Sequence, residues 1–297
     1  MAYILGVDIG TSGTKTVLFS EDGTPVASAT YEYPLYTPQN GYAEQEPLDW
    51  WNASVNGIKD VISQSNVSAD DIKGVGLSGQ MHGLVMLDAE NQPIRKSIIW
   101  CDQRTAKEVA EITDKVGADR MIEITANPAI TGFTAAKIMW VKNNEPQNYE
   151  KCRHILLPKD YIRFMLTGEF ATEVSDASGM QLLDIPNRCW SDEVLNKLGI
   201  DKALLARVYE SPEITGTITA KAAELTGLKA GTPVVGGAGD NAAAAVGTGT
   251  VGDGRCNISL GTSGTIFISS EKFGVDEHNA LHSFAHADGH YHLMGCM

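Results

Sequence analysis

The strongest constraint on the fold is a six-residue segment that occurs twice in this chain. Residues 9–14 read IGTSGT and residues 260–265 read LGTSGT, so one conservative change separates the copies. Each copy lies between apolar runs rich in strand-forming residues, and the spacing of about 250 residues is far too long for a solenoid. Two related domains, each opening with a strand, a glycine turn and a strand, explain the repeat better than two unrelated turns of similar composition.

The pattern of apolar residues predicts a β-rich start followed by mixed strands and helices. Residues 3–9, 14–20 and 25–33 are β-forming runs joined by short turns, which predicts three antiparallel strands. Residues 47–65 carry apolar side chains at helical spacing, with Pro47 in the first turn. Further strands are expected at 74–78, 84–87, 232–236 and 291–297, and helices at 104–116, 133–143, 159–166, 191–199, 218–226 and 240–246. This mixture indicates an α/β fold rather than a purely doubly wound sheet.

The length of 297 residues suits about two domains. We place the first at residues 1–245 and the start of the second at 246–297, because the second copy of the repeat falls there. The chain ends soon after that copy, inside a strand-like run. We therefore expect the second domain to be cut short.

The acidic composition argues against several classes of partner. The formal net charge is -14, and an acidic surface repels nucleic acid and anionic membranes. No apolar run approaches the roughly 20 residues of a membrane span, and no signal-peptide pattern is visible. Five scattered cysteines without a Cys-x-x-Cys pair indicate reduced thiols. These features favour a cytoplasmic protein, and a homodimer is the default expectation.

The two glycine turns are candidates for binding a polyphosphate. Glycines let the backbone approach an anion and let successive amides point at it, and Thr and Ser add hydroxyl donors. Lys15 adds a positive charge, but its spacing from the glycines does not fit a Walker A loop. One such turn alone more often only connects strands, whereas a pair could grip a polyphosphate across a cleft. The candidate phosphate-binding residues are Gly10, Thr11, Ser12, Lys15, Gly261 and Thr262.

Asp8 ends the strand before the first turn. A carboxylate beside bound phosphates is repelled unless a cation lies between them, and Mg²⁺ binds one or two carboxylates together with phosphates and water. Asp8 is therefore a candidate magnesium ligand. Its alternative role is to form the turn.

A second candidate centre lies where the predicted strand at 232–236 runs through glycines into an alanine-rich helix. Asp240 stands at the start of this helix, whose terminal amides favour an ionised carboxylate. It could accept a proton from a substrate hydroxyl, and Asn241 could bind neighbouring hydroxyls. The alternative is a simple helix cap. A Gly-x-Gly-x-x-Ala dinucleotide fingerprint also fits, but this unit does not open a domain and too little chain follows it.

Three further groups are weaker candidates. Gln80, Met81 and His82 lie between glycines at a predicted strand end and suit a hydroxyl-rich ligand, although a structural turn explains them at least as well. Trp100 could form the floor of a sugar site, but a local ion pair in the residues after it is slightly favoured. Five histidines between 278 and 292 suggest a metal site; their surroundings suit a strand or loop better, and no acidic partner is suitably spaced.

Together these segments resemble the FGGY carbohydrate kinases. Residues 8–15, 239–241 and 260–265 look like that family's phosphate and base motifs. Residues 132–144 resemble its first signature, and residues 157–169 are similar to a further conserved segment. The resemblance covers almost the whole chain. It implies two actin-like, ribonuclease-H-like domains, with ATP and a sugar meeting in the cleft between them.

The resemblance also implies roles for single residues. Asp240 would accept the proton of a terminal sugar hydroxyl, and Asp8 would lie near Mg²⁺. The segment 80–83 resembles the substrate loop of members that act on D-xylulose, where glycerol kinases carry an arginine and a glutamate. D-Gluconate is the alternative substrate, and a non-metabolic actin- or chaperone-type ATPase is the alternative class. The residues implied to line the sugar are Met81, His82, Asp240 and Asn241, and those implied to face the phosphates are Thr11, Ser12, Lys15 and Thr262.

The length departs from the family pattern. Family members are much longer and bind adenine in their second domain. We therefore expect this chain to carry the sugar side and half of the phosphate clamp. On its own, the chain is expected to have little or no kinase activity.

Overall fold

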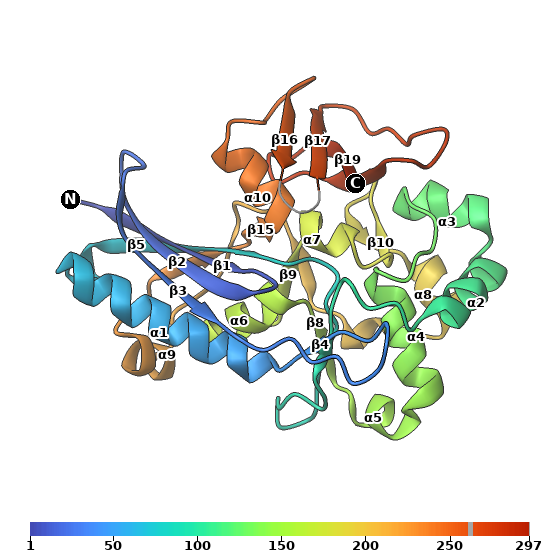
Figure 1. The fold of residues 1–297 in the computed structure, drawn as a ribbon, viewed down its shortest axis with the longest axis horizontal. Helices are drawn as coiled ribbons and strands as arrows, with labels where there is room; N and C mark the ends of the chain where they lie inside the picture. The colour runs from blue at the N-terminus through green and yellow to red at the C-terminus, as the bar shows by residue number, and fades with distance from the viewer. Residues whose placement is uncertain (261–263, 297) are drawn as a thin grey trace.

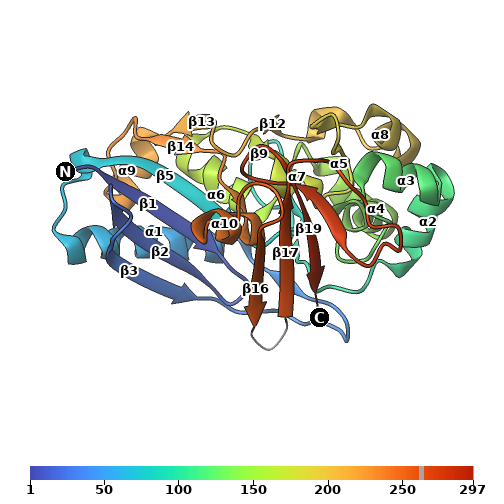
Figure 2. The ribbon, with the colours of Figure 1, turned by 90° about the horizontal axis from the view of Figure 1, so that it is seen from above.

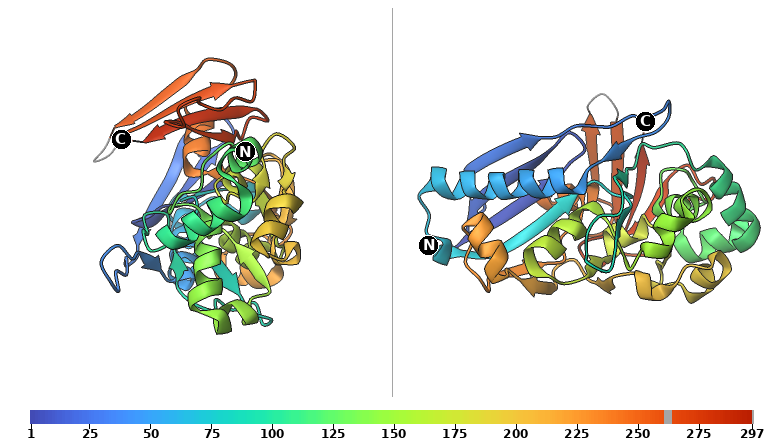
Figure 3. Two further views of the ribbon diagram at one scale, coloured as in Figure 1. Left: turned by 90° about the vertical axis from the view of Figure 1, so that its right-hand side faces the viewer. Right: turned by 90° about the horizontal axis from the view of Figure 1, so that it is seen from below.

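The computed structural model describes residues 1–260 and 264–296. It is elongated, with a twisted sheet and its helices at one end and a helical region at the other (Figure 1). A small sheet near the C-terminus lies over the junction between the two ends, and the views from above and from the side show it crossing the middle of the molecule (Figures 2 and 3).

A seven-stranded mixed sheet forms the scaffold of the first end. The strand order is β13-β14-β5-β1-β2-β3, with β15 also paired with β5. The first three strands form the predicted antiparallel meander. In contrast, β5 runs parallel to β1, β14 and β15. The strand bounds are β1 Tyr3–Ile9, β2 Gly13–Ser20, β3 Pro25–Glu32, β5 Ile72–Gly79, β13 Ile214–Thr217, β14 Pro233–Val235 and β15 Ala238–Gly239.

Three helices cover one face of this sheet: α1 (Pro47–Ser65) and α6 (Pro158–Thr167) pack on its strands, and α9 (Ala220–Thr226) packs on these two helices. Alternate residues of β1, among them Leu5 and Ile9, are fully buried against the apolar faces of these helices. Trp50 and Ile58 of α1 belong to the same core. Burying one such side chain stabilises the fold by about 1.5–3 kcal/mol, so this core fixes the sheet that carries the predicted site.

The helical end has its own core, which includes Ile112, Met121 and Ile138. Its helices are α2 (Ala106–Val116), α3 (Ala118–Thr125), α4 (Thr134–Asn144), α5 (Pro146–Lys151) and α8 (Asp192–Leu198). The short strand pairs are β4 (Glu44–Gln45) with β7 (Ser97–Ile98), β6 (Val85–Leu87) with β8 (His154–Leu156), β9 (Ala171–Glu173) with β12 (Arg207–Tyr209), and β10 (Leu183–Asp184) with β11 (Cys189–Trp190). The short helices are α7 (Val174–Ser178), η1 (Ala69–Asp71) and η2 (Lys202–Leu204).

The chain then enters α10 (Asp240–Gly247) and the small C-terminal sheet, whose strand order is β16-β17-β19-β18. Its strands are β16 (Cys256–Leu260), β17 (Gly264–Ser270), β18 (His282–Ala285) and β19 (Tyr291–Cys296). Phe267 of this sheet packs on α10, and Phe284 packs on Phe133 of the helical end. Within residues 1–260 and 264–296, no helix combines the length and apolarity needed to cross a membrane.

The predicted α/β architecture is confirmed, and the predicted strands and helices occur with their ends shifted by no more than two residues. The last residue of the predicted strand at 291–297 lies outside the described part. Sequence patterns did not indicate α3, α5, α7 or the two-residue strand β15. These elements are too short for a clear hydrophobic period, and tertiary contacts determine them.

Candidate active site

The predicted residues meet where three parallel strands end. The register places Ile9 of β1 opposite Gly79 of β5, and Gly79 opposite Gly239 of β15. The segments that follow these three strands therefore leave the sheet along one edge. Ligands of open α/β sheets bind beyond the carboxyl ends of parallel strands. The residues that follow these strand ends are Gly10, Gln80 and Asp240.

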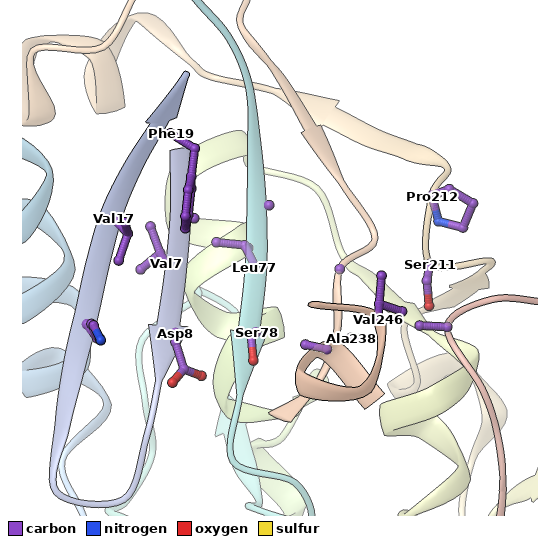
Figure 4. A pocket seen from close by; sticks show the side chains of 16 residues that line it. Val7, Asp8, Val17, Phe19, Leu77, Ser78, Ser211, Pro212, Ala238 and Val246 are labelled. Carbon is purple, nitrogen blue, oxygen red and sulfur yellow. The ribbon is translucent and has the colours of Figure 1, made fainter. Parts of the chain in front are cut away.

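A pocket of about 550 Å³ opens on the sheet face that the three helices leave uncovered. Figure 4 shows Asp8 and Ser78 side by side in this pocket, with Phe19 further along the strands. Most of the other lining atoms are apolar, and α10 and Ala287 border the pocket. The residues that line it are Gly6, Val7, Asp8, Lys15, Val17, Phe19, Gly76, Leu77, Ser78, Ser211, Pro212, Gly237, Ala238, Ala243, Val246 and Ala287.

The first glycine turn is held from the side by a polar network. The Trp100 Nε1 donates to the Thr11 hydroxyl at 2.9 Å, and that hydroxyl lies 3.4 Å from the Gln80 Oε1. The Gln45 Nε2 donates to the Thr11 carbonyl at 2.7 Å, and the Gln80 Nε2 donates to the Gln45 Oε1 at 2.8 Å. Gln80 and Trp100, both predicted to bind substrate, therefore direct their side-chain polar groups at the turn. Trp100 remains 46% exposed, so its ring can still face a ligand.

Asp8 and Lys15 are cross-strand partners on β1 and β2, so their side chains project from the same face of the sheet. The Asp8 Oδ1 is buried and has no hydrogen-bond partner among the described residues. A lone carboxylate oxygen of this kind fits Mg²⁺, which takes its remaining ligands from phosphates and water. The described chain contains no cluster of three His, Cys, Asp or Glu side chains that could hold a metal by themselves. Lys15 and Ser12 are exposed at the same end of the sheet.

Asp240 begins α10, as predicted, and its Oδ1 accepts hydrogen bonds from the Asn241 backbone N–H at 2.7 Å and the Asn241 Nδ2 at 2.8 Å. Burial and, to a smaller extent, the charge of Asp8 raise the pKa of Asp240 to about 6. The carboxylate is therefore mostly ionised at pH 7 and is more basic than an ordinary aspartate. Such a group can accept a proton from a hydroxyl placed beside it.

The segment 80–83 lies against the residues that carry Asp240. Met81 is buried and packs on Gly239, where an added Cβ would lie 2.8 Å from the Met81 Cγ. His82 has a left-handed backbone with φ of 68°, which is rare for a residue other than glycine. Its ring stacks on Phe133 at 4.4 Å between centroids, and its Nδ1 lies 2.9 Å from the Gly179 carbonyl oxygen. Burial, and then the charge of Lys137, lower the pKa of His82 to about 3.

A buried group of five charged side chains lies behind the segment that leads to Asp240; we call it the ion cluster. The Lys159 Nζ lies 3.0 Å from an Asp176 oxygen and 3.3 Å from a Glu173 oxygen. Arg163 donates to the Gly236 carbonyl. The members are Lys159, Asp160, Arg163, Glu173 and Asp176, and all are fully buried.

The ion cluster also reaches Gly239 through one serine. The Gly239 backbone N–H donates to the Ser175 hydroxyl at 3.1 Å, and that hydroxyl donates to Glu173 at 2.9 Å. The backbone from Gly236 to Gly239 is thus held at both ends. This arrangement fixes the direction in which Asp240 leaves the sheet.

Some of the residues considered in the sequence analysis are not part of this described site. Gly261 and Thr262 fall outside the described residues. Asp102 and Arg104 form the local ion pair that the sequence favoured over a sugar-binding role, at 2.7 Å. His286 and His292 are buried in and beside the C-terminal sheet, where they pack on Phe267.

Sequence reasoning gave no role to Lys137 or to the ion cluster. A signal was present, because Lys137 interrupts an apolar helical segment and Lys159 and Arg163 lie on the predicted helix at 159–166. Their partners lie far away in sequence, so the pattern alone could not identify the contacts.

Comparison with known proteins places this geometry in a family. Residues 3–247 match the model of the N-terminal domain of the FGGY family of carbohydrate kinases. A xylulose kinase of Bacillus subtilis is 41% identical over 286 residues, which are 96% of this chain and 57% of the relative. The crystal structure of a "xyloylose kinase" from Brucella ovis is 39% identical with a TM-score of 0.93, covering 99% of this chain and 60% of that one. A gluconate kinase structure from Lactobacillus acidophilus is 27% identical with a TM-score of 0.93, covering 99% and 59%.

The chain belongs to the FGGY family of carbohydrate kinases, and its fold is the actin-like α/β fold of these sugar kinases. It spans about 60% of the length of the relatives that it matches.

Proposed function

We propose, with this family membership as the premise, that the chain forms the sugar-binding part of an ATP-dependent kinase that phosphorylates D-xylulose. The observation that carries the proposal is the position of Asp240, which has a raised pKa. It follows β15 at the sheet edge where the 80–83 segment follows β5 and where β1 carries Asp8. The xylulose kinase relatives support D-xylulose as the substrate.

The proposed reaction transfers the γ-phosphoryl group of ATP to the terminal hydroxyl of the sugar. Asp240 accepts the hydroxyl proton while the sugar oxygen forms its bond to phosphorus and the bond to the ADP oxygen breaks. The products are D-xylulose 5-phosphate and ADP. Met81, His82 and Asn241 hold the sugar so that this hydroxyl faces the carboxylate, and such positioning supplies much of the rate enhancement in phosphoryl transfer.

The first glycine turn would hold the nucleotide. We assign the backbone of Gly10 and the side chains of Ser12 and Lys15 to the phosphates, with Thr11 shaping the turn through its hydrogen bonds to Gln80 and Trp100. Asp8 would hold Mg²⁺, which neutralises charge on the phosphates when bound. We also propose that residues 1–245 form the sugar domain, and that residues 246–297, with Gly261 and Thr262, begin a nucleotide domain.

D-Gluconate is the second candidate substrate, because a gluconate kinase has the same fold over nearly all of this chain. The test completes the chain with the C-terminal part of the Bacillus subtilis relative and measures ADP release with D-xylulose, D-gluconate, other pentuloses and polyols. The proposal predicts the highest kcat/KM for D-xylulose. A clear preference for D-gluconate would replace the substrate, and ATP hydrolysis that no sugar stimulates would favour a non-metabolic ATPase.

A further inference from the structure

Among the described residues, the buried Lys137 has no ion-pair partner. It lies on α4, and its side chain is 0% exposed. Within the described residues it forms no ion pair, and the carboxylate of Asp102, which attracts it, is held by Arg104 and the Ala43 backbone N–H. Burying an unpaired ammonium is costly, and burial lowers the pKa of Lys137 to about 7. The cost of burying Lys137 suggests that its side chain has a specific role.

The hydrogen bonds of Lys137 indicate this role. Its Nζ donates to the backbone carbonyls of His82 and Gly132, both at 2.7 Å. The Thr134 hydroxyl donates to the same His82 carbonyl at 3.1 Å. Two donors from the start of α4 thus converge on the carbonyl of a residue with a left-handed backbone. Left-handed backbone in a non-glycine residue persists only where its surroundings impose it.

The side chain of His82 is fixed from the other side. A carbonyl only accepts hydrogen bonds, so the contact with Gly179 places the proton of the neutral imidazole on Nδ1 and leaves a lone pair on Nε2. The positive charge of Lys137 also disfavours a second proton on this ring. The imidazole is therefore held as a neutral group that can accept a hydrogen bond from a sugar hydroxyl.

We propose that Lys137 is a positioning residue for the sugar: it holds the His82 carbonyl and so keeps the 80–83 segment in the shape that presents Met81 and His82 to the ligand. This assignment rests on the proposed function, which gives Met81 and His82 to the sugar. Lys137 itself is not assigned a contact with the substrate.

The test replaces Lys137 with Met, which has a similar length and no donor. Lys142→Met is the matched control, because Lys142 lies on the same helix and also donates to two carbonyls, those of Leu198 and Gly199, away from this site. Calorimetric titration of the 297-residue chain with D-xylulose should show affinity weakened roughly 10- to 100-fold in Lys137→Met, the range for a lost charged hydrogen bond. Lys142→Met should stay within about twofold of the unsubstituted chain.

Thermal unfolding of the same variants separates positioning from a purely structural role. Lys137→Met removes the cost of burying an ammonium but leaves the His82 and Gly132 carbonyls without this donor. Lys142→Met also removes two such hydrogen bonds, so the Tm of the two variants should be similar, while only Lys137→Met loses sugar affinity. A lowered Tm with unchanged D-xylulose affinity would overturn the proposal. If Lys137→Met does not fold, Thr134→Val removes the second donor to the His82 carbonyl and should weaken affinity roughly 2- to 10-fold; unchanged affinity would again overturn it.

Nitrogen NMR of the imidazoles gives a readout that does not depend on the substrate. The His82 signals, assigned by difference with His82→Gln, should show the Nδ1–H form in the unsubstituted chain and in Lys142→Met, and should shift in Lys137→Met. If the unsubstituted chain binds no sugar of the panel, the proposed function fails while this measurement still decides the role of Lys137. Identical His82 signals in Lys137→Met would refute the positioning role.

Discussion

The two segments that form the candidate site are supported in opposite ways. The backbone from Gly236 to Gly239, which leads to Asp240, is held by the ion cluster, in which two cations face three carboxylates. The 80–83 segment is held by Lys137, which forms no ion pair among the described residues, and by the Thr134 hydroxyl. Both supports are fully buried, yet one is compensated in charge and the other is not.

This difference in charge compensation determines how each support should respond to the loss of a side chain. In the ion cluster, burial lowers the pKa of Lys159, but the charges of Asp160, Asp176 and Glu173 outweigh burial and raise it. Burial raises the pKa of Asp176. Removing one member of the ion cluster would leave buried opposite charges without a partner, whereas removing Lys137 leaves no opposite charge unpaired. The ion cluster should therefore govern stability, and Lys137 should govern the shape of the sugar site.

The largest expected effect is that of replacing Asp240, which should lower the rate of phosphoryl transfer but not sugar binding. In a chain completed to the length of its relatives, Asp240→Asn should lower kcat by about 10²–10⁴-fold, the usual contribution of a positioned general base. Sugar affinity should largely survive, because the amide keeps the shape of the carboxylate. Because burial disfavours the charged form of Asp240, the variant should be at least as stable as the parent. Steady-state kinetics and calorimetry check this, and normal turnover would remove Asp240 from the mechanism.

The next effect compares the two supports directly. Lys159→Met should destabilise the fold by about 3–5 kcal/mol, because it leaves buried carboxylates without their cation. Lys137→Met serves as the matched control and should cost less, because it leaves two carbonyls but no carboxylate without a partner. Urea unfolding of both variants measures the difference. If the two variants lost equal free energy of unfolding, the proposed difference between the ion cluster and Lys137 would be wrong.

The smallest effect is the dependence of activity on pH. Because the pKa of Asp240 is raised to about 6, the base is protonated as the pH falls below that value. In the completed chain, kcat/KM should fall about tenfold per pH unit well below pH 6. Between pH 5 and 6, D-xylulose affinity should change little, because Lys137, with a pKa of about 7, stays protonated and His82, with a pKa lowered to about 3, stays neutral. A fall in affinity that parallels the fall in kcat/KM would assign the titration to the sugar site instead.

The parts of the molecule that sequence could predict are those encoded by adjacent residues. The meander over residues 3–33, the turn at Gly10 and the place of Asp240 at a helix start all follow from local composition and spacing. The short element β15 was not predictable, because its two residues form a strand only by pairing with β5.

Contacts between distant segments explain the rest of what was missed. Lys137 is 55 positions from His82, whose carbonyl it holds, and no local pattern reveals that partner. Gln80 and Trp100 are predicted to meet a ligand, and their polar groups also contact the first glycine turn from segments far along the chain, which no local pattern indicated. Local pattern identified the candidate site, while tertiary packing determines which side chains face it and which ones support it.

The most direct test of this account is a crystal structure of the 297-residue chain with bound D-xylulose. The account predicts the sugar between the 80–83 segment and α10, with its terminal hydroxyl within hydrogen-bond distance of the Asp240 carboxylate. A sugar bound elsewhere, or bound with that hydroxyl turned away from Asp240, would contradict the central claim.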